Sequence, residues 1–168
     1  MKTLTSVMDF MKSRQEAESP VGFIPTMGAL HVGHESLIKR SVEENKSTVA
    51  SIYVNPTQFD NKIDLAAYPE TMEHDQLILE SLGVDILLAP TFEQMYPDGF
   101  RYQVLEEGFS RELCGDHRDG HFTGVLTVVM KLLNIVNPDK AYFGEKDYQQ
   151  YLLIRDMVNA FFLDVEIV

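Results

Sequence analysis

The chain alternates between short apolar runs and longer segments in which apolar residues recur at helical spacing. The runs have the length of buried strands and lie at residues 21–24, 48–54, 86–89 and 141–143. The helical spacing predicts helices at residues 35–45, 71–82, 122–136 and 147–160. Strands that alternate with helices in this way predict a three-layer α/β fold with a mainly parallel sheet.

The remaining segments complete this prediction. Residues 1–19 are typical of a short extended start followed by an amphipathic helix that buries Val7, Phe10 and Met11. Residues 102–105 are predicted as a short edge strand, and residues 165–168 as the start of a further strand. The segment 122–136 is apolar on nearly every face, which indicates a helix buried in the core or at a subunit interface. No repeat or linker appears, so we expect one domain over residues 1–168.

The net charge of the chain limits the kinds of molecule that it can bind over a broad surface. The net charge of −12 argues against a broad nucleic-acid surface or an anionic membrane as partner, so any bound anion is held locally. No segment is suited to a signal peptide, and the longest nearly apolar run is too short to cross a bilayer. The single cysteine, Cys114, forms no internal disulfide and agrees with a reducing compartment. We therefore expect a soluble, cytoplasmic protein.

Residues 25–34, Pro-Thr-Met-Gly-Ala-Leu-His-Val-Gly-His, join a predicted strand to a predicted helix. Ligands of parallel α/β sheets bind at such turns, at the carboxyl ends of strands. Gly28 and Gly33 allow close backbone approach, and the first N–H groups of the helix favour an anion such as phosphate. The P-loop and G-x-G-x-x-G fingerprints are absent, but His31 and His34 lie nearly one helical turn apart and can donate to one phosphate.

Two further loops carry candidate chemistry. The turn at residues 144–147 contains Lys146, a mobile positive charge for phosphate, and Asp147, which caps a helix or accepts from a ribose hydroxyl. The loop at residues 55–59 begins at another strand end and can direct the Asn55 and Gln58 amides toward a polar substrate. The residues alone indicate a nucleotide-binding α/β domain.

Four motifs in order resemble those of the pantothenate synthetase family, a member of the nucleotidylyltransferase superfamily with its HIGH signature. They lie at residues 25–34, 55–59, 118–125 and 144–150, and the resemblance covers nearly all of the chain. It implies a Rossmann-like domain in an ATP-dependent carbon–nitrogen ligase. The implied reaction joins pantoate to β-alanine through a pantoyl adenylate and releases AMP and pyrophosphate.

The resemblance also implies residue roles and a homodimer. Catalysis is assigned to His34, His31 and Lys146. ATP binding is assigned to Met27, Gly28, Ala29, Leu30, His31, Val32, Gly33, His34, Gly144, Glu145, Lys146 and Asp147. Pantoate is assigned to Gln58, Gln150 and Asn55, and β-alanine to Gln58. Mg²⁺ is expected on the triphosphate, with Asp75 as a possible outer ligand.

One departure and three alternatives accompany this interpretation. The family's second phosphate loop and its smaller carboxyl-terminal domain do not follow residue 168, so we expect a chain that binds ATP but makes pantothenate slowly. One alternative is another nucleotidylyltransferase with the same histidine signature. A second is a metal-binding module that uses His31, His34, His117 and His121. The third is a non-catalytic, nucleotide-binding interaction domain.

Overall fold

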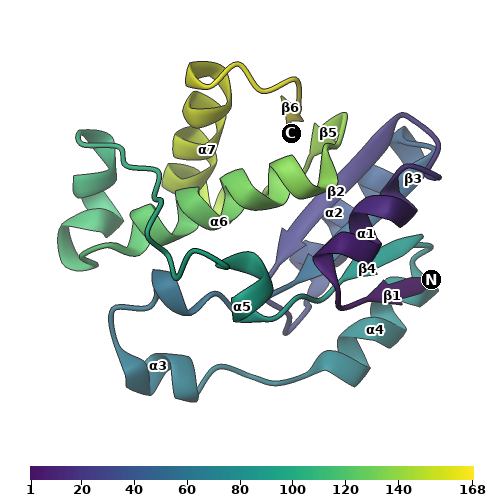
Figure 1. Cartoon of the computed structure of the whole chain (residues 1–168), viewed down its shortest axis with the longest axis horizontal. Coiled ribbons are helices and arrows are strands. Elements are labelled where there is room, and N and C mark those ends of the chain that lie inside the picture. Colours follow the sequence, from purple (N-terminus) through teal and green to yellow (C-terminus); the bar gives the residue numbers. More distant parts are fainter.

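A parallel sheet of six strands runs through the molecule in the order β1-β4-β3-β2-β5-β6. The computed structural model describes all 168 residues. The strands are β1 (Lys2–Leu4), β2 (Val21–Thr26), β3 (Ser47–Ile52), β4 (Ile86–Leu88), β5 (Lys140–Ala141) and β6 (Glu166–Ile167). Figure 1 shows β2 and β3 in the middle of this sheet. The predicted three-layer α/β class is confirmed.

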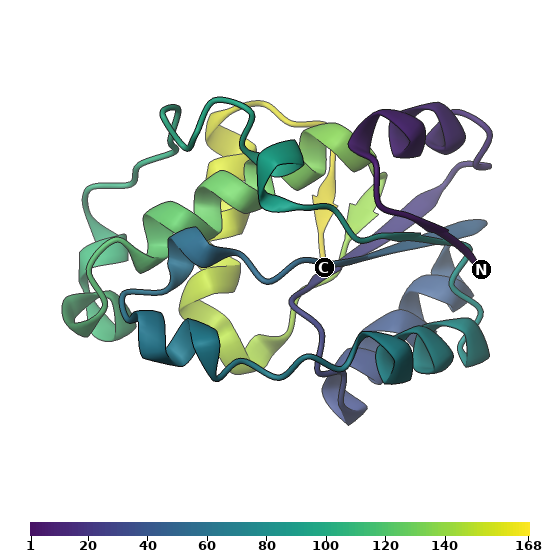
Figure 2. The same cartoon turned by 60° about the horizontal axis from the view of Figure 1, so that its bottom comes forward.

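Helices cover both faces of the sheet. They are α1 (Val7–Arg14), α2 (Val32–Glu44), α3 (Lys62–Ala66), α4 (Met72–Ser81), α5 (Phe92–Met95), α6 (His121–Val136) and α7 (Tyr148–Ala160). In Figure 2, α1 and α6 lie above the strands, whereas α2 and α4 lie below them. None of these helices is long and apolar enough to cross a membrane.

Two apolar cores follow from the alternation of side chains along the strands. Phe23 and Val49 belong to the larger core, with α1, α6 and α7. Ile24 and Ala50, the next residue in each strand, belong to the smaller core, with α2 and α4. Because strands of this sheet are buried on both faces, they appear in the sequence as continuous apolar runs.

Two details of the sequence prediction are wrong. Residues 102–105 form no strand: Tyr102 and Leu105 are 68% and 61% exposed, and the Val104 N–H donates to the Thr127 hydroxyl of α6 instead of to a strand. Met11 is 43% exposed, since α1 is short and packs mainly through Phe10. Apolar spacing alone did not identify which side chain faces the sheet.

The strand order creates a crevice beside β2. From β2 the chain crosses over to β3 on one side, whereas β5 pairs with β2 on the other side. Ligands of open parallel sheets bind where the order reverses, outside the carboxyl ends of the strands. The turns that follow β2 and β5 therefore lie next to each other, although more than a hundred residues separate them.

Candidate active site

A cavity of about 1270 Å³ occupies this crevice. It is lined by residues from three separated segments that sequence analysis had singled out: Met27, Gly28, Ala29, His31, Gly33, His34, Gln58, Gly144, Glu145, Lys146, Asp147 and Gln150. The fold thus brings the histidine turn, the amide-bearing loop and the lysine turn to one cavity. A second wall is apolar and comes from Val125, Val128 and Val129 of α6.

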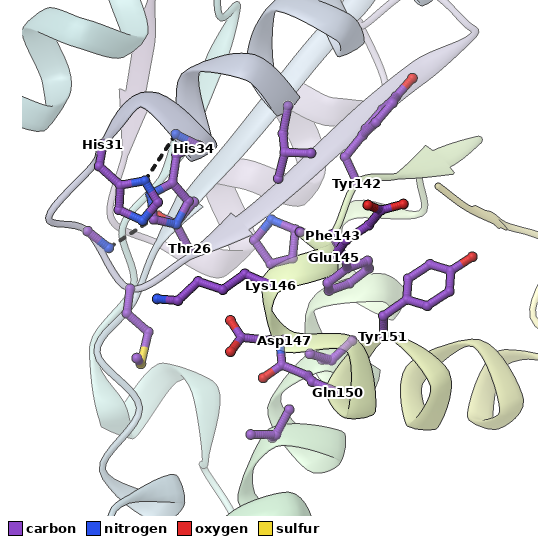
Figure 3. A pocket seen from close by; sticks show the side chains of 18 of the residues that line it. Thr26, His31, His34, Tyr142, Phe143, Glu145, Lys146, Asp147, Gln150 and Tyr151 are labelled. Carbon is purple, nitrogen blue, oxygen red and sulfur yellow. Dashed lines mark hydrogen bonds between the residues drawn. The ribbon is translucent and has the colours of Figure 1, made fainter. Parts of the chain in front are cut away.

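His31 caps the amino terminus of α2. Its Nδ1 accepts a hydrogen bond from the Gly33 N–H at 3.1 Å, drawn as a dashed line in Figure 3. Because Nδ1 is the acceptor, the proton of the neutral ring lies on Nε2, which is free to donate to a ligand. A Cβ at position 33 would lie 2.9 Å from the His31 ring, so glycine is needed for this cap. That contact explains the His-x-Gly-His pattern.

His34 lies against His31, with ring centroids 4.2 Å apart. Burial lowers the pKa of His34 below its ordinary value of 6.5, and His31 and Lys146 lower it further, against the raising effects of Asp75 and Asp147. The imidazole is therefore neutral at neutral pH. Its Nδ1 is buried without a hydrogen-bond partner, which favours the tautomer with the proton on Nε2. His34 thus acts as a neutral donor, and His31 beside it has its Nε2 free to donate.

Lys146 supplies positive charge at this end of the cavity. It lies in the 3-10 turn η4 (Glu145–Asp147), between β5 and α7. Figure 3 shows its side chain extending toward the two histidine rings. No carboxylate lies within 4.0 Å of its ammonium group, so the charge is available to a ligand. One ammonium group and two imidazoles together make an anion site.

Asp75 has a different position from the one predicted. It is 1% exposed and does not line the cavity. Its Oδ2 accepts from the Ala29 N–H at 2.9 Å and the Thr71 hydroxyl at 2.8 Å, and its Oδ1 accepts from the Leu30 N–H at 2.9 Å. These bonds hold Ala29 in the left-handed region, at φ 51°. These bonds give Asp75 a structural role, because they fix the histidine turn, and its role as an outer ligand of magnesium stays a prediction.

Three more predicted residues lie outside the cavity wall. Leu30 is 9% exposed and packs in the smaller core. Val32 is 81% exposed and points to solvent from the first turn of α2. Asn55 is 1% exposed, and its amide is bonded entirely within the protein. A turn cannot direct every side chain into one cavity, and the sequence did not distinguish those that face it from those that support it.

The motif at residues 118–125 supports the loop at residues 55–59. The His121 ring donates from Nδ1 to the Gln58 carbonyl oxygen at 2.8 Å. Gly124 lies so close to this loop that an added Cβ would be 2.4 Å from the Thr57 carbonyl oxygen. The Asn55 amide also donates to the Gly124 carbonyl oxygen at 3.2 Å. The amino-terminal part of α6 thus serves as the platform for residues 55–58.

Some cavity residues were missed by sequence analysis. They include Tyr53, Tyr142, Tyr151, Arg40 and Arg155 and the three valines of α6. The valines could not be separated from core residues, because α6 is apolar on nearly all of its faces. Arg40 gave no signal either, since a charged residue on a helix is normally solvated.

The arrangement of the histidines does not support the alternative of a metal-binding module. No group of three or more potential ligands gathers at any point in the structure. The His117 side chain is 84% exposed, and His121 is engaged by the Gln58 carbonyl. Only His31 and His34 are close to each other. Tetrahedral metal sites need three or four converging ligands.

Comparison with known proteins identifies the family to which this chain is similar. A family model described as pantoate-beta-alanine ligase matches residues 1–168. The pantothenate synthetase of Bdellovibrio bacteriovorus is 52% identical over 99% of this chain and 66% of its own length. That of Legionella pneumophila (strain Lens) is 54% identical over 88% of this chain and 58% of its own length.

Comparison with solved structures points to the same family as the sequence comparison. The pantoate-beta-alanine ligase of Francisella tularensis, described as complexed with beta-gamma ATP and beta-alanine, superposes with a TM-score of 0.98 at 44% identity and covers all of this chain. The pantothenate synthetase of Thermus thermophilus gives 0.94 at 46% identity. The chain spans 66% and 60% of these two proteins. Since the family model matches every residue and the relatives are about half identical, this chain belongs to the pantoate-beta-alanine ligase family.

Proposed function

We propose that the cavity binds ATP and pantoate and forms pantoyl adenylate, which then reacts with β-alanine to give pantothenate. The observation that carries this proposal is the convergence of His31, His34 and Lys146 on a cavity that also presents the Gln58 and Gln150 amides. Support comes from the Francisella tularensis relative, whose structure is described as complexed with beta-gamma ATP and beta-alanine.

In the first step, a pantoate carboxylate oxygen attacks the α-phosphorus of ATP. The bond between that phosphorus and the bridging oxygen breaks, and pyrophosphate leaves with the electron pair. Negative charge grows on the phosphate oxygens, so donors fixed in advance lower the barrier most. Lys146 provides the charge, and His31 and His34 provide N–H donors at the other side of the same phosphates.

In the second step, the amine of β-alanine attacks the acyl carbon of the adenylate. AMP leaves with the carboxylate oxygen that came from pantoate, and the amine loses a proton. The Gln58 and Gln150 amides are suited to the hydroxyl and carboxylate oxygens of pantoate, because amides both donate and accept hydrogen bonds. The α6 valines provide an apolar wall for the two methyl groups of pantoate.

Magnesium fits this cavity as an ion carried by the triphosphate. The protein offers no ready cluster of ligands, but the Glu145 and Asp147 carboxylates line the cavity beside Lys146. Mg²⁺ in nucleotide sites usually keeps several waters and takes only one or two carboxylates along with phosphate oxygens. When bound, it would neutralise phosphate charge, and Asp147 would be the residue to hold it.

The expectations of a homodimer and of a cytoplasmic location remain proposals. A measurement of the molecular mass in solution tests the expectation of a homodimer.

Replacing Gln58 with leucine is expected to weaken pantoate binding roughly tenfold while ATP binding changes less than about twofold. Leucine keeps the bulk of the side chain but removes the amide that bonds substrate oxygens, a loss of about 1 to 1.5 kcal/mol. Calorimetry with each ligand measures the two effects. Gln15→Leu is the matched control, because it makes the same substitution at an exposed side chain. Equal losses for ATP and pantoate would indicate local unfolding and contradict this assignment.

The overall reaction tests the proposed function. AMP release is expected to need ATP, pantoate and β-alanine together, and to be slow for residues 1–168 by themselves. His31, His34 and Lys146 supply donors from two turns, and each further preorganised donor beyond them typically adds roughly a hundredfold or more in rate. The measurement compares these residues with a chain extended to the length of the relatives. Comparable turnover in both would contradict the prediction of slow reaction, and AMP release without pantoate would contradict the function.

A further inference from the structure

The hydroxyl group of Tyr96 starts a chain of hydrogen bonds that ends at Gln58 in the cavity. Tyr96 lies at the end of α5, is 2% exposed and does not line the cavity. Its hydroxyl donates to Asn55 Oδ1 at 3.0 Å. Asn55 Nδ2 in turn donates to Gln58 Oε1 at 3.2 Å. A residue remote from the ligand is thereby connected to one that faces it.

The direction of this chain is fixed by two backbone groups. The Thr57 N–H, which can only donate, lies 3.4 Å from Asn55 Oδ1, and the Gly124 carbonyl, which can only accept, lies 3.2 Å from Asn55 Nδ2. The Thr57 hydroxyl adds a third donor to Oδ1 at 3.0 Å. The Asn55 amide therefore has one orientation, with its oxygen toward Tyr96 and its nitrogen toward Gln58.

The orientation of Asn55 determines that of Gln58. Since Asn55 presents an N–H, Gln58 must turn its oxygen toward it and its Nε2 away from it. That Nε2 lies 3.0 Å from Met27 Sδ, on a residue that lines the cavity. Thioether sulfur is a weak acceptor, so a ligand oxygen can readily replace it. Gln58 is thus set to donate, and the group that it binds must be an oxygen acceptor.

We propose that Tyr96 is a positioning residue for substrate binding, which acts through Asn55 to keep Gln58 as a donor toward an acceptor oxygen of pantoate. This rests on the proposed function for its ligand. The ring of Tyr96 is held by Phe92 and Phe100, with centroids 5.0 Å and 5.3 Å away, and by Lys131, whose Nζ lies 4.8 Å from the ring centroid. The hydroxyl therefore has a fixed place from which to donate.

The test is Tyr96→Phe, which keeps the packed ring and removes only the hydroxyl. Without it, Asn55 Oδ1 loses one of its three donors, so the Asn55 amide, and through it the Gln58 amide, is held less firmly in its orientation. We expect pantoate binding to weaken about fivefold to tenfold, as for one lost hydrogen bond, and ATP binding to change less than about twofold. Calorimetry measures both, and Tyr102→Phe, which removes an exposed hydroxyl, is the matched control.

A second measurement needs no substrate. In the unliganded protein, the Gln58 side-chain NH₂ resonances should be sharp, and Tyr96→Phe should broaden them or accelerate their hydrogen exchange, whereas Tyr102→Phe leaves them unchanged. Unchanged resonances together with unchanged pantoate affinity in Tyr96→Phe would overturn the inference. Parallel losses of ATP and pantoate binding would also overturn it, because they would show a general structural role. If the unaltered protein binds no pantoate, the proposed function fails, and the resonances alone decide the role of Tyr96.

Discussion

Replacing Lys146 with alanine is expected to weaken ATP binding roughly tenfold to a hundredfold, because hydrogen bonds to charged groups contribute about 1.5 to 3 kcal/mol. The ammonium group has no carboxylate partner within 4.0 Å that it would have to leave, so its whole charge serves the ligand. His34→Ala should weaken binding less, since a neutral imidazole contributes a weaker hydrogen bond than an ammonium group.

The measurement is calorimetry with ATP and magnesium for both variants. Lys12→Ala is the matched control, because Lys12 is 75% exposed and pairs with Asp9 on α1, away from the cavity. Raising the salt concentration should reduce the difference between Lys146→Ala and the unaltered protein, as expected for a charge-dependent contact. ATP affinity that stays the same in both Lys146→Ala and His34→Ala would mean that this cavity end does not bind the phosphates.

Asp75→Ala is expected to lower the free energy of unfolding by about 3 kcal/mol and to weaken ATP binding strongly. The change leaves the buried Leu30 N–H without its acceptor and the Ala29 N–H with only the Thr71 hydroxyl at 3.1 Å, and an unpaired buried donor costs about 1 to 3 kcal/mol. It also releases Ala29 from a left-handed conformation that costs a residue with a side chain roughly 1 to 2 kcal/mol. The turn that carries His31 should therefore lose its shape.

Denaturant unfolding and ATP calorimetry check this prediction. Asp75→Asn should have a smaller effect, since one oxygen still accepts while an NH₂ group opposes the other backbone donor. Glu73→Ala on the same helix is the control, because Glu73 is exposed and makes no hydrogen bond. If Asp75 bound magnesium instead, Asp75→Ala would weaken only magnesium-dependent binding and leave the free energy of unfolding unchanged.

The pKa of His34 gives a further readout of the Asp75 charge. Asp75 raises the pKa of His34, although burial keeps that pKa below 6.5. In the Asp75→Asn variant, His34 should therefore titrate at a still lower pH. A depressed histidine pKa also means that the unfolded chain binds a proton more readily than the folded protein. This contribution therefore favours folding above the unfolded pKa and becomes unfavourable as the pH falls below it.

Local periodicity was enough to predict most elements of the fold. The apolar runs at β2, β3 and β4 and the mostly apolar α6 appear in the sequence because these elements are buried on more than one face. Short elements at the edge of the sheet were harder to predict. Residues 102–105 have the composition of a strand, but no strand lies beside them with which they could pair. The strand order was not predictable either, since it depends on long-range pairing.

The site was predictable where its residues lie in turns at strand ends. His31, His34 and Lys146 follow β2 and β5, and the parallel sheet brings those ends together. The supporting residues were not predictable in their roles. Asp75 sits on a helix like a solvated carboxylate, and only the fold shows that it meets the N–H groups of residues 29 and 30. Asn55 looks like a substrate contact until its partners in α6 and α5 are known.

The most direct test of this account is calorimetric titration of the protein with ATP and magnesium, followed by pantoate. We predict one molecule of ATP bound per chain, with a dissociation constant at or below the millimolar range common for enzyme substrates, and a pantoate site that Gln58→Leu weakens selectively. Lys146→Ala should reduce the ATP affinity in the same titration. Absence of ATP binding at millimolar concentration, or ATP binding that Lys146→Ala leaves unchanged, would contradict the assignment of this cavity to nucleotide chemistry.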